Sequence, residues 1–294
     1  MTIAAADRLG AVVRRARGFA ERRPPTCPPG WRTGPPDFVG IGVQKAGTSW
    51  WYRLVTEHPQ VFRRDALAKE LHFFGRFNDR AFTRADVARY HAHFPRPDGA
   101  RLGEWTPRYL PDFWTHQQLR EAAPDCRLLV LLRDPVDRYR SGITHEVNQG
   151  ARPSPTLALE AMYRGMYHLQ LSALLRSFPR EQILVLQYEQ CQNNARRELA
   201  RTYEFLGLGN TDFTPMTLHQ RINGTPTGKV ELPADLRAEL LALYQPDVLA
   251  LVNDFPEIDV RLWPNFRDVD APGAAARLLG RRAAHLRSVP PIGE

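Results

Sequence analysis

The sequence predicts an α/β protein, a three-layer sandwich in which helices flank a central parallel sheet. Short apolar runs of strand length alternate along the chain with longer stretches of helical composition, and this alternation favours a parallel sheet covered on both faces. At 294 residues the chain is long enough to bury a large core. Hydrophobic residues make up 43% and charged residues 24%, which is typical of a globular domain.

The predicted elements follow one another in regular order. Three runs rich in Val, Ile and Leu are read as buried strands, at 38–43, 127–132 and 182–187. Stretches of helical composition are read as helices, at 48–57, 112–121, 136–146, 157–177, 193–206 and 234–253. Asp134 and Pro135 follow the second strand and suit the N-cap and first position of the next helix. Residues 207–232, rich in Gly, Thr and Pro, are read as irregular.

Composition divides the chain into three parts. Residues 1–36 combine a basic leader with a stretch from 24 to 36 whose prolines exclude helix and central strand. Residues 37–264 form the predicted folded domain, and residues 265–294 form an extension rich in Arg and Ala. The leader is read as a short basic amphipathic segment that is partly disordered, with peripheral membrane contact as the alternative. It lacks an apolar core of signal-peptide length, and no apolar run approaches the roughly 20 residues of a membrane helix.

The net charge of +8 favours anionic partners, with 40 Lys and Arg against 32 Asp and Glu. Lys45, Lys69 and Lys229 are the chain's lysines, and all other basic residues are arginines. A lysine kept in such an Arg-rich chain indicates a position where a compact ammonium is needed rather than a planar guanidinium.

Three scattered cysteines, Cys27, Cys126 and Cys191, are too few for a disulfide framework or a zinc site. At least one thiol is unpaired within the chain, which fits a reducing compartment. A cytoplasmic location is therefore expected. Oligomeric state is left open.

The loop after the first strand has the features of a phosphate cradle. Gly42 and Gly47 free the backbone, and a helix begins at Thr48, so several unpaired N–H groups and the positive helix end face one point. The glycines have P-loop spacing, but Thr48 stands where the P-loop lysine belongs, and the lysine lies inside the loop at Lys45. The sequence thus favours a P-loop-like fold. A P-loop-type kinase or NTPase is the alternative function.

A second candidate anion site follows the second predicted strand. Arg133 lies at its carboxyl end, where open α/β sheets bind ligands, and Ser141 lies two helical turns further on. Arg133 or Arg138 could instead pair with Asp134 or Asp137 and have no role in binding. Taken with the first loop, this segment predicts a ligand with two separated phosphate-like groups.

Five segments, in order, resemble the sulfotransferases that use 3′-phosphoadenosine 5′-phosphosulfate (PAPS). The loop at 44–50 resembles their 5′-phosphosulfate loop, and 133–141 resembles their 3′-phosphate motif R-D-P-x-x-R-x-x-S. The others are similar to motifs of the heparan-sulfate-type N- and 3-O-sulfotransferases, K-E-x-H-F-F at 69–74, G-E-K-T-P-x-Y at 103–109 and G-x-Y-x-x-Q-L at 165–171. The resemblance covers about 37–264 and points to a bacterial member.

The resemblance implies a reaction and a donor site. PAPS passes its sulfuryl group by in-line displacement to a hydroxyl or amine, and no metal is required. The residues implied in donor binding are Lys45, Ala46, Gly47, Thr48, Ser49, Trp50, Arg133, Ser141, Gly228 and Lys229. For Lys229 an ordinary exposed loop position is the alternative.

Three residues are assigned to catalysis. Lys45 would stabilise charge developing on the bridging oxygen, and Glu70 would act as the general base. His72 is the competing base, with contact to the acceptor as its other role. Without the resemblance, Glu70 is read as a carboxylate that only pairs with Lys69.

One departure from the motifs concerns the acceptor. Trp105 occupies the position of the family's lysine in G-E-K-T-P, a lysine that faces the transferring sulfonate or the acceptor. At the rim of the cleft its indole could stack on a sugar or aromatic ring, and a place in the core is the alternative. Trp105, Arg108 and His72 are the predicted substrate-binding residues. A carbohydrate, a glycolipid or a small natural product is expected as acceptor, and nucleic acid is not, because aromatic residues are not interleaved with the basic ones.

Overall fold

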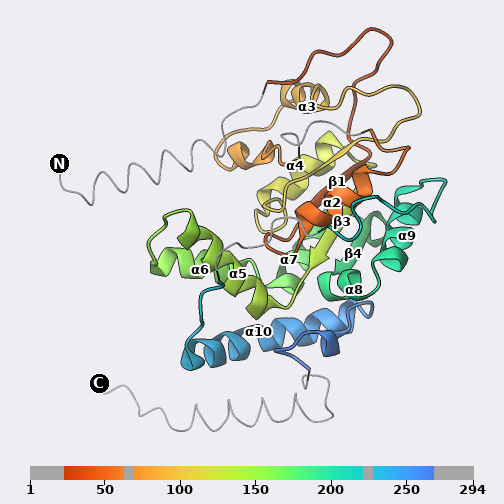
Figure 1. The fold of residues 1–294 in the computed structure, drawn as a ribbon. Helices are drawn as coiled ribbons and strands as arrows, with labels where there is room; N and C mark the ends of the chain where they lie inside the picture. Colours follow the sequence, from red (N-terminus) through yellow and green to blue (C-terminus); the bar gives the residue numbers. More distant parts are fainter. Residues whose placement is uncertain (1–22, 63–68, 221–227, 268–294) are drawn as a thin grey trace.

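A parallel sheet lies at the centre of the protein (Figure 1). The computed structural model describes residues 23–62, 69–220 and 228–267. Within these residues four strands pair in the order β2-β1-β3-β4, all parallel. The strands are β1 (Phe38–Gly42), β2 (Gly103–Trp105), β3 (Arg127–Leu132) and β4 (Ile183–Gln187). The predicted α/β fold is confirmed, with β2 as a strand that the sequence did not reveal.

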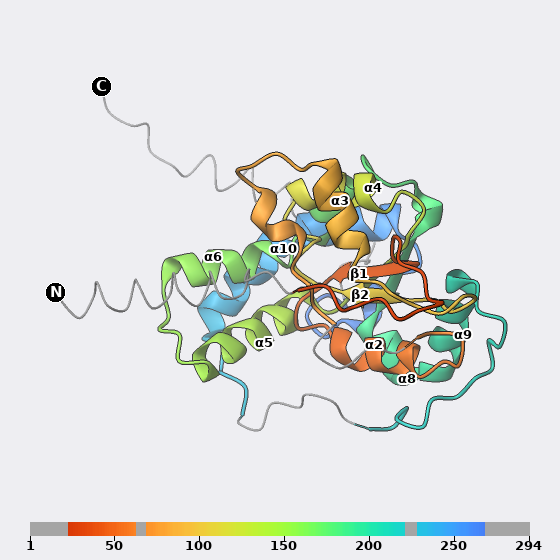
Figure 2. The same ribbon diagram turned by 90° about the horizontal axis from the view of Figure 1, so that it is seen from above.

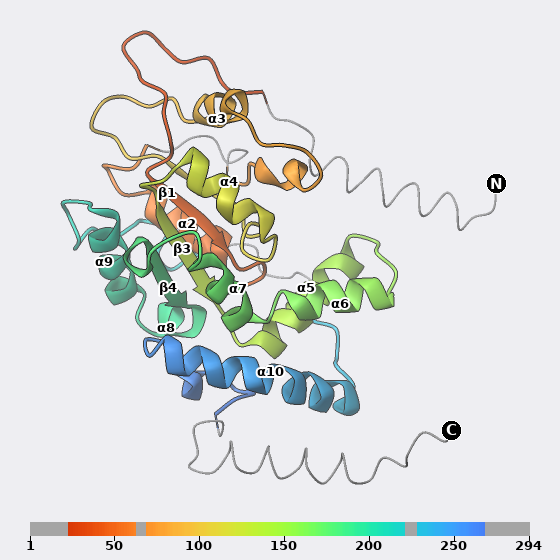
Figure 3. The ribbon, with the colours of Figure 1, turned by 180° about the vertical axis from the view of Figure 1, so that it is seen from behind.

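Helices cover both faces of the sheet. The main helices are α2 (Thr48–Thr56), α3 (Arg84–His91), α4 (Trp114–Ala122), α5 (Pro135–Asn148), α6 (Pro155–Tyr163), α7 (Tyr167–Leu174), α8 (Tyr188–Asn193), α9 (Ala195–Leu206) and α10 (Ala234–Asp254). Short 3-10 turns are η2 (Phe74–Phe77), η3 (Arg180–Gln182) and η4 (Val260–Leu262). Figure 2 shows α2, α8 and α9 on one side of the sheet and α3 and α4 on the other. Helix α10 runs along α5 and α7 (Figure 3).

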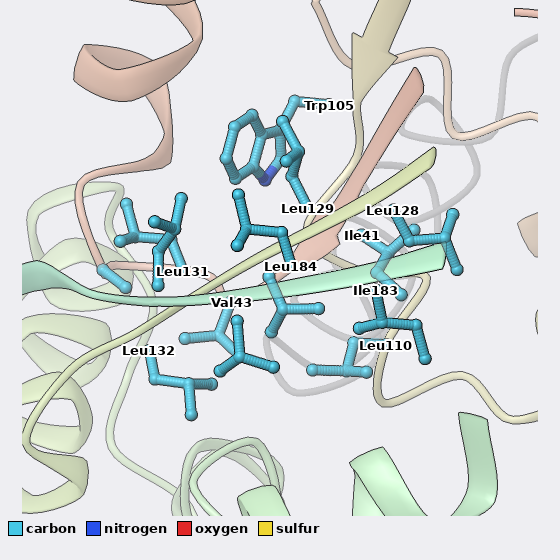
Figure 4. Packing of buried hydrophobic residues seen from close by; sticks show 14 of the residues in the cluster. Ile41, Val43, Trp105, Leu110, Leu128, Leu129, Leu131, Leu132, Ile183 and Leu184 are labelled. Atoms are coloured by element: carbon cyan, nitrogen blue, oxygen red, sulfur yellow. The ribbon is translucent and has the colours of Figure 1, made fainter. Parts of the chain in front are cut away.

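The core is continuous through the sheet because its strands are apolar on both faces. Every residue of β1 and β4 is buried, and β3 is buried from its second residue onward. Such strands belong to parallel sheets with two covered faces. Figure 4 shows side chains from several strands meeting here, among them Ile41, Leu129 and Leu184.

One predicted helix is wrong in extent. The stretch 157–177 forms two helices, α6 and α7, separated at Arg164–Met166. A Cβ on Gly165 would lie 2.7 Å from the Tyr244 hydroxyl oxygen, and that hydroxyl donates a hydrogen bond to the Met162 carbonyl at 2.9 Å. Tyr244 on α10 therefore satisfies a carbonyl at the end of α6 and occupies the space beside Gly165.

Residues just outside the predicted domain 37–264 pack against the folded domain at both of its ends. Trp31, in the proline-rich stretch, meets Phe62 edge to face with ring centroids 4.9 Å apart. At the other end, Phe266 is buried in the core although it lies in the predicted extension. The leader residues 1–22 and the extension residues 268–294 lie outside the described residues, so the predictions made for them stay predictions.

The three cysteines are free thiols, two of them buried. Among the described residues, none of the helices combines the length and apolar character needed to cross a membrane.

The strand order fixes where a ligand can bind. β1 leads to β2 on one side, and β3 lies on the other side of β1. Loops leaving the carboxyl ends of β1 and β3 therefore diverge and leave a crevice between them, the place where open α/β sheets bind ligands. The two predicted anion-binding segments follow β1 and β3, so the topology brings them together.

Candidate active site

The loop from β1 to α2 has the backbone geometry of an anion site. Lys45 and Gly47 both have positive φ, 71° and 86°, so the chain turns tightly before α2 begins. No side chain caps this end of α2 in the described structure, which leaves its N–H groups for a ligand. A Cβ on Gly47 would lie 2.7 Å from the Tyr188 ring, so glycine is needed for space as well as for conformation.

Lys45 projects from this loop among charged groups. Burial is the largest influence on its ammonium and lowers its pKa, and Glu146 and Glu70 counteract part of that shift. The lysine placed in the loop by the sequence is thus in the electrostatic field of the predicted base. Ala46 and Thr48 are buried, and Ser49 and Trp50 are half-buried at the start of α2.

Glu70 lies between Lys69 and His72. Its Oε1 is 2.7 Å from Lys69 Nζ, and its Oε2 is 3.2 Å from His72 Nε2. Burial alone would raise the pKa of Glu70, but the hydrogen bond from His72 and the charge of Lys69 outweigh it and lower the pKa to about 2. The carboxylate is therefore ionised at neutral pH and able to accept a proton. The two candidate bases form one hydrogen-bonded pair.

A buried carboxylate that the sequence analysis did not single out positions these residues. Glu104, on β2, is fully buried and accepts hydrogen bonds from four groups: Leu71 N, Thr106 Oγ1, Tyr90 Oη and Tyr109 Oη. Burial raises the pKa of Glu104, while hydrogen bonds from Thr106 and Tyr90 oppose that shift. Because Leu71 follows Glu70 directly, the Glu104 cluster fixes the backbone that presents Glu70 and His72. His72 itself has a positive φ of 50°.

The prediction that Trp105 lies at the rim of the cleft and contacts substrate is wrong. Its side chain is fully buried, and Nε1 donates to the Gly42 carbonyl at 3.1 Å. The ring lies against Gly40, where a Cβ would be 1.9 Å from Trp105 Cδ2 (Figure 4). Glycine in β1 leaves the space that the indole fills, so the alternative place in the core is correct.

Arg133 reaches back from the end of β3 to the first loop. One guanidinium nitrogen donates to the Lys45 carbonyl at 3.3 Å, and another to Asp137 at 3.2 Å. Its Cζ lies 5.1 Å from the centre of the Tyr188 ring, and its buried Nε has no hydrogen-bond partner in the described structure. The alternative pairing of Arg133 with an aspartate is therefore present, and the contact to the loop carbonyl is an addition that the sequence did not predict. Ser141 is buried further along α5.

The start of α5 is held by a cluster that joins three segments. Asp134 caps the helix as predicted, accepting from Val136 N at 3.0 Å. Its other oxygen accepts from the backbone and side chain of Asn265. Glu189 accepts from Asp134 N at 3.1 Å and from Trp263 Nε1 at 3.0 Å. Burial raises the pKa of Glu189 to about 7, against opposing hydrogen bonds that include the one from Asp134 N.

The segment that carries Lys229 attaches to the same helix. Val230 N donates to Thr144 Oγ1 at 3.1 Å, and Arg140 Nε donates to the Val230 carbonyl at 2.8 Å. The segment is thus attached to α5 at Arg140 and Thr144, with Lys229 half-buried and Gly228 exposed before it. Residues 221–227 lie outside the described part of the chain.

A cavity of about 110 Å³ opens beside Glu70 and His72. Arg108, a predicted substrate-binding residue, lines this cavity and pairs with Asp112 at 2.8 Å. Arg164 and Gln170, which the sequence analysis did not assign, line it as well. Arg164 donates to Gln44 Oε1 at 2.6 Å, which joins this wall to the first loop. Gln170 is fully buried, and its Oε1 has no partner within the described residues. The full lining is Val43, Gln44, Glu70, His72, Pro107, Arg108, Pro111, Arg164 and Gln170.

A second hollow lies on the other side of the loop. Trp50 and Tyr188 meet there edge to face, with centroids 6.2 Å apart. Tyr188 was missed from the sequence, although its place directly after β4 is a signal, because strand ends border the ligand crevice. The lining is Gly47, Trp50, Tyr188, Leu218, His219, Gln192 and Gln220. Within the described residues, no group of His, Cys, Asp and Glu side chains is arranged to hold a metal ion.

Fold and site together define a P-loop-like α/β protein in which the loop from β1 to α2 borders the cavity that holds a carboxylate–histidine pair. The sulfotransferase domain family matches residues 35–225, more than half of the chain, and the protein belongs to this family.

The chain is similar in sequence to several heparan sulfate sulfotransferases. The mouse and human heparan sulfate glucosamine 3-O-sulfotransferase 6 are 31% identical over 195 residues, which is 61% of this chain and 54% of theirs. The human bifunctional heparan sulfate N-deacetylase/N-sulfotransferase 3 is 25% identical over 198 residues, 59% of this chain and 22% of its own. The chain thus spans about half the length of the 3-O-sulfotransferases it matches.

Solved structures agree on the fold. A sulfotransferase from Alicyclobacillus acidocaldarius superposes with a TM-score of 0.60 at 25% identity, covering 78% of this chain and 98% of that one. The sulfotransferase STF9 from Mycobacterium avium, at 13% identity, superposes with a TM-score of 0.51 over 76% of this chain and 77% of its own. The P-loop-like fold is therefore shared with bacterial members of the family.

Proposed function

We propose that this protein transfers the sulfuryl group of PAPS to a hydroxyl or amine of a carbohydrate, glycolipid or small natural product, with Glu70 as general base. The observation that carries the proposal is the meeting of two parts of the site. Lys69 touches both Thr48, at the start of the phosphate-binding loop's helix, and Glu70 in the neighbouring cavity. Donor and acceptor groups bound on these two sides would meet between them.

On the donor side, each phosphate of PAPS has a set of partners. The N–H groups at the start of α2 and the Lys45 ammonium would hold the 5′-phosphate, because a helix N-terminus and a nearby cation both favour an anion. Arg133, Ser141 and Lys229 would hold the 3′-phosphate, since Arg133 reaches the loop and the Lys229 segment is attached to α5. Trp50 and Tyr188 line the hollow that would take the adenine.

On the acceptor side, Glu70 would take the proton that the acceptor releases as its bond to sulfur forms. Its place in the cavity wall suits that role. The contacts from His72 and Lys69 that lower its pKa to about 2 also make it a weaker base, so a bound acceptor would have to displace or weaken them. His72 donates to it, which orients the carboxylate and leaves His72 as the competing base. Lys45 would stabilise negative charge on the leaving 5′-phosphate oxygen, and the fixed loop amides would contribute to the same end.

The acceptor proposal rests on the cavity and on the relatives. Arg108 and Arg164 line the cavity, each paired with a carboxylate, and offer N–H donors to a polar acceptor. The matched relatives are named for heparan sulfate glucosamine, a carbohydrate, which supports a carbohydrate acceptor. The kinase alternative is not favoured, because Thr48 stands where the P-loop lysine would lie and the family match is to sulfotransferases.

Thermal unfolding with the product nucleotide tests the donor assignment. The protein is heated with 3′-phosphoadenosine 5′-phosphate (PAP), with and without EDTA, and in parallel with ATP and Mg²⁺. A ligand that binds only the folded state, at 100 times its Kd, stabilises it by about 2.7 kcal/mol. PAP is expected to raise the melting temperature equally with and without EDTA. A rise with ATP and Mg²⁺ alone would instead favour the kinase, and no rise with PAP would contradict the proposal.

A further inference from the structure

Lys69 has a position that the roles assigned so far do not explain. Its Nζ lies 2.7 Å from Glu70 Oε1 and 3.4 Å from Thr48 Oγ1, and its side chain is only 13% exposed. The backbone is held as well, because the Lys69 carbonyl accepts from Trp105 N at 2.7 Å next to the edge of the sheet. The ammonium is thus fixed between the phosphate-binding loop and the proposed base.

This position lies beside the path of the transferred group. The 5′-phosphate would bind where α2 begins at Thr48, and the acceptor would bind where Glu70 can take its proton. A sulfuryl group passing between them crosses the region that the Lys69 ammonium spans, since Nζ is within hydrogen-bonding range of both ends. Lys69 therefore lies beside the line from the 5′-phosphate to the acceptor, whereas Lys45 lies in the loop at the phosphate end of that line.

The chemistry of the contacts suits such a role. An ammonium has three N–H donors, and the contacts to Glu70 and Thr48 use two of them. Thr48 Oγ1 accepts from Lys69, so its own O–H is directed elsewhere and can donate to a phosphate oxygen. Lysine is also rare here, and an ammonium concentrates its charge at one point, unlike the guanidinium that the chain uses at nearly all its basic positions.

We propose that Lys69 binds the sulfuryl group of PAPS directly, contacting its peripheral oxygens while the group moves from the phosphate to the acceptor. The proposal rests on the proposed function and extends it by one residue. In the step, the bond between sulfur and the phosphate oxygen breaks and the bond between sulfur and the acceptor oxygen or nitrogen forms. The acceptor's proton goes to Glu70, the leaving electron pair stays on the 5′-phosphate, and Lys69 keeps its proton throughout.

PAP and PAPS differ only in the sulfuryl group, so the pair of ligands isolates this contact without knowledge of the acceptor. Calorimetric titration of the full chain with each ligand, in the absence of acceptor, gives the ratio of the two dissociation constants. In Lys69→Met, PAPS affinity should fall about tenfold or more, because a hydrogen bond to a charged group is lost, while PAP affinity stays the same. Lys69→Arg keeps the charge and should retain most of the preference for PAPS.

Lys229→Met is the matched control. Lys229 is assigned to the 3′-phosphate, which both ligands carry, so its loss should weaken PAP and PAPS by the same factor. Equal weakening of PAP and PAPS in Lys69→Met, or no weakening of either, would overturn the role of Lys69. If the melting curve shows that Lys69→Met does not fold, Lys69→Arg decides the question. Loss of the PAPS preference in Lys69→Arg would count against the proposal, and retention of that preference would support it. Failure of the parent protein to bind PAP would instead contradict the proposed function.

Discussion

The two main segments of the proposed donor side each have a conformation set by neighbouring residues, whereas the residues of the proposed acceptor side are held in place by segments far apart in the sequence. The loop from Val43 to Gly47 and the segment from Arg133 to Ser141 each follow a strand and begin a helix. Their geometry follows from local chemistry: a left-handed glycine at the start of α2 and an aspartate cap with proline on α5. Glu70 and His72, in contrast, are held by a buried carboxylate more than thirty positions further on. Local motifs thus shape the two segments proposed to bind the donor, and long-range packing positions the residues proposed for the acceptor side.

Glu70→Gln should have the largest effect, and only on the acceptor side. The amide cannot take a proton, so turnover of PAPS with the acceptor used by the parent should fall about 10²- to 10⁴-fold. Affinity for PAP should stay unchanged, because the carboxylate is not among the groups assigned to either phosphate. Rate assays and PAP titration of the same preparation measure both. A smaller loss in Glu70→Gln than in His72→Gln would assign the base to His72.

Arg133→Ala should have the converse effect, on donor binding. Loss of a charge-assisted contact to the 3′-phosphate should weaken PAP about 10- to 100-fold, and the melting-temperature rise with PAP should shrink accordingly. Arg197→Ala is the control, since the Arg197 side chain is 81% exposed on α9. If the two variants bind PAP equally well, Arg133 serves only its pairing with Asp137 and the contact to the loop carbonyl.

The same contrast explains what could be predicted from the sequence. The fold class, the two strand–loop–helix segments and the cap at Asp134 depend on residues close in the chain, and the structure places these elements as expected. Anion binding by the two segments stays a prediction. Trp105 was misplaced because its environment depends on Gly40 in the neighbouring strand, a pairing that spacing along the chain does not reveal. The break between α6 and α7 likewise depends on Tyr244 of α10, although Gly165 within the helical pattern was a local signal.

Glu104→Gln should lower stability and turnover but leave PAP affinity unchanged, because Glu104 holds only the proposed acceptor side. An amide in place of the carboxylate turns one acceptor oxygen into a donor that faces other donors, so the variant should be about 2 kcal/mol less stable. Turnover should fall because the backbone at Leu71 carries Glu70, while PAP affinity should be retained. Denaturant unfolding and PAP titration measure these effects. Weakened PAP binding in a folded Glu104→Gln variant would show that the two sides are not independent.

Glu189→Gln should affect stability rather than turnover, and the effect should depend on pH. The pKa of Glu189 is raised to about 7, above its ordinary value, so the folded protein keeps a proton that the unfolded chain has lost. This contribution to stability is fully present below the ordinary glutamate pKa and is lost as pH rises through about 7.

The glutamine has no such titration. As pH rises from 5 to 8, the unfolding free energy of the parent should therefore fall relative to that of Glu189→Gln, by at most about 1.4 kcal/mol per pH unit. Glu204→Gln, at an exposed position on α9, is the matched control for the loss of a carboxylate. A constant difference across this range would mean that Glu189 is ionised throughout, and that its link between Asp134 and Trp263 costs the fold nothing at neutral pH.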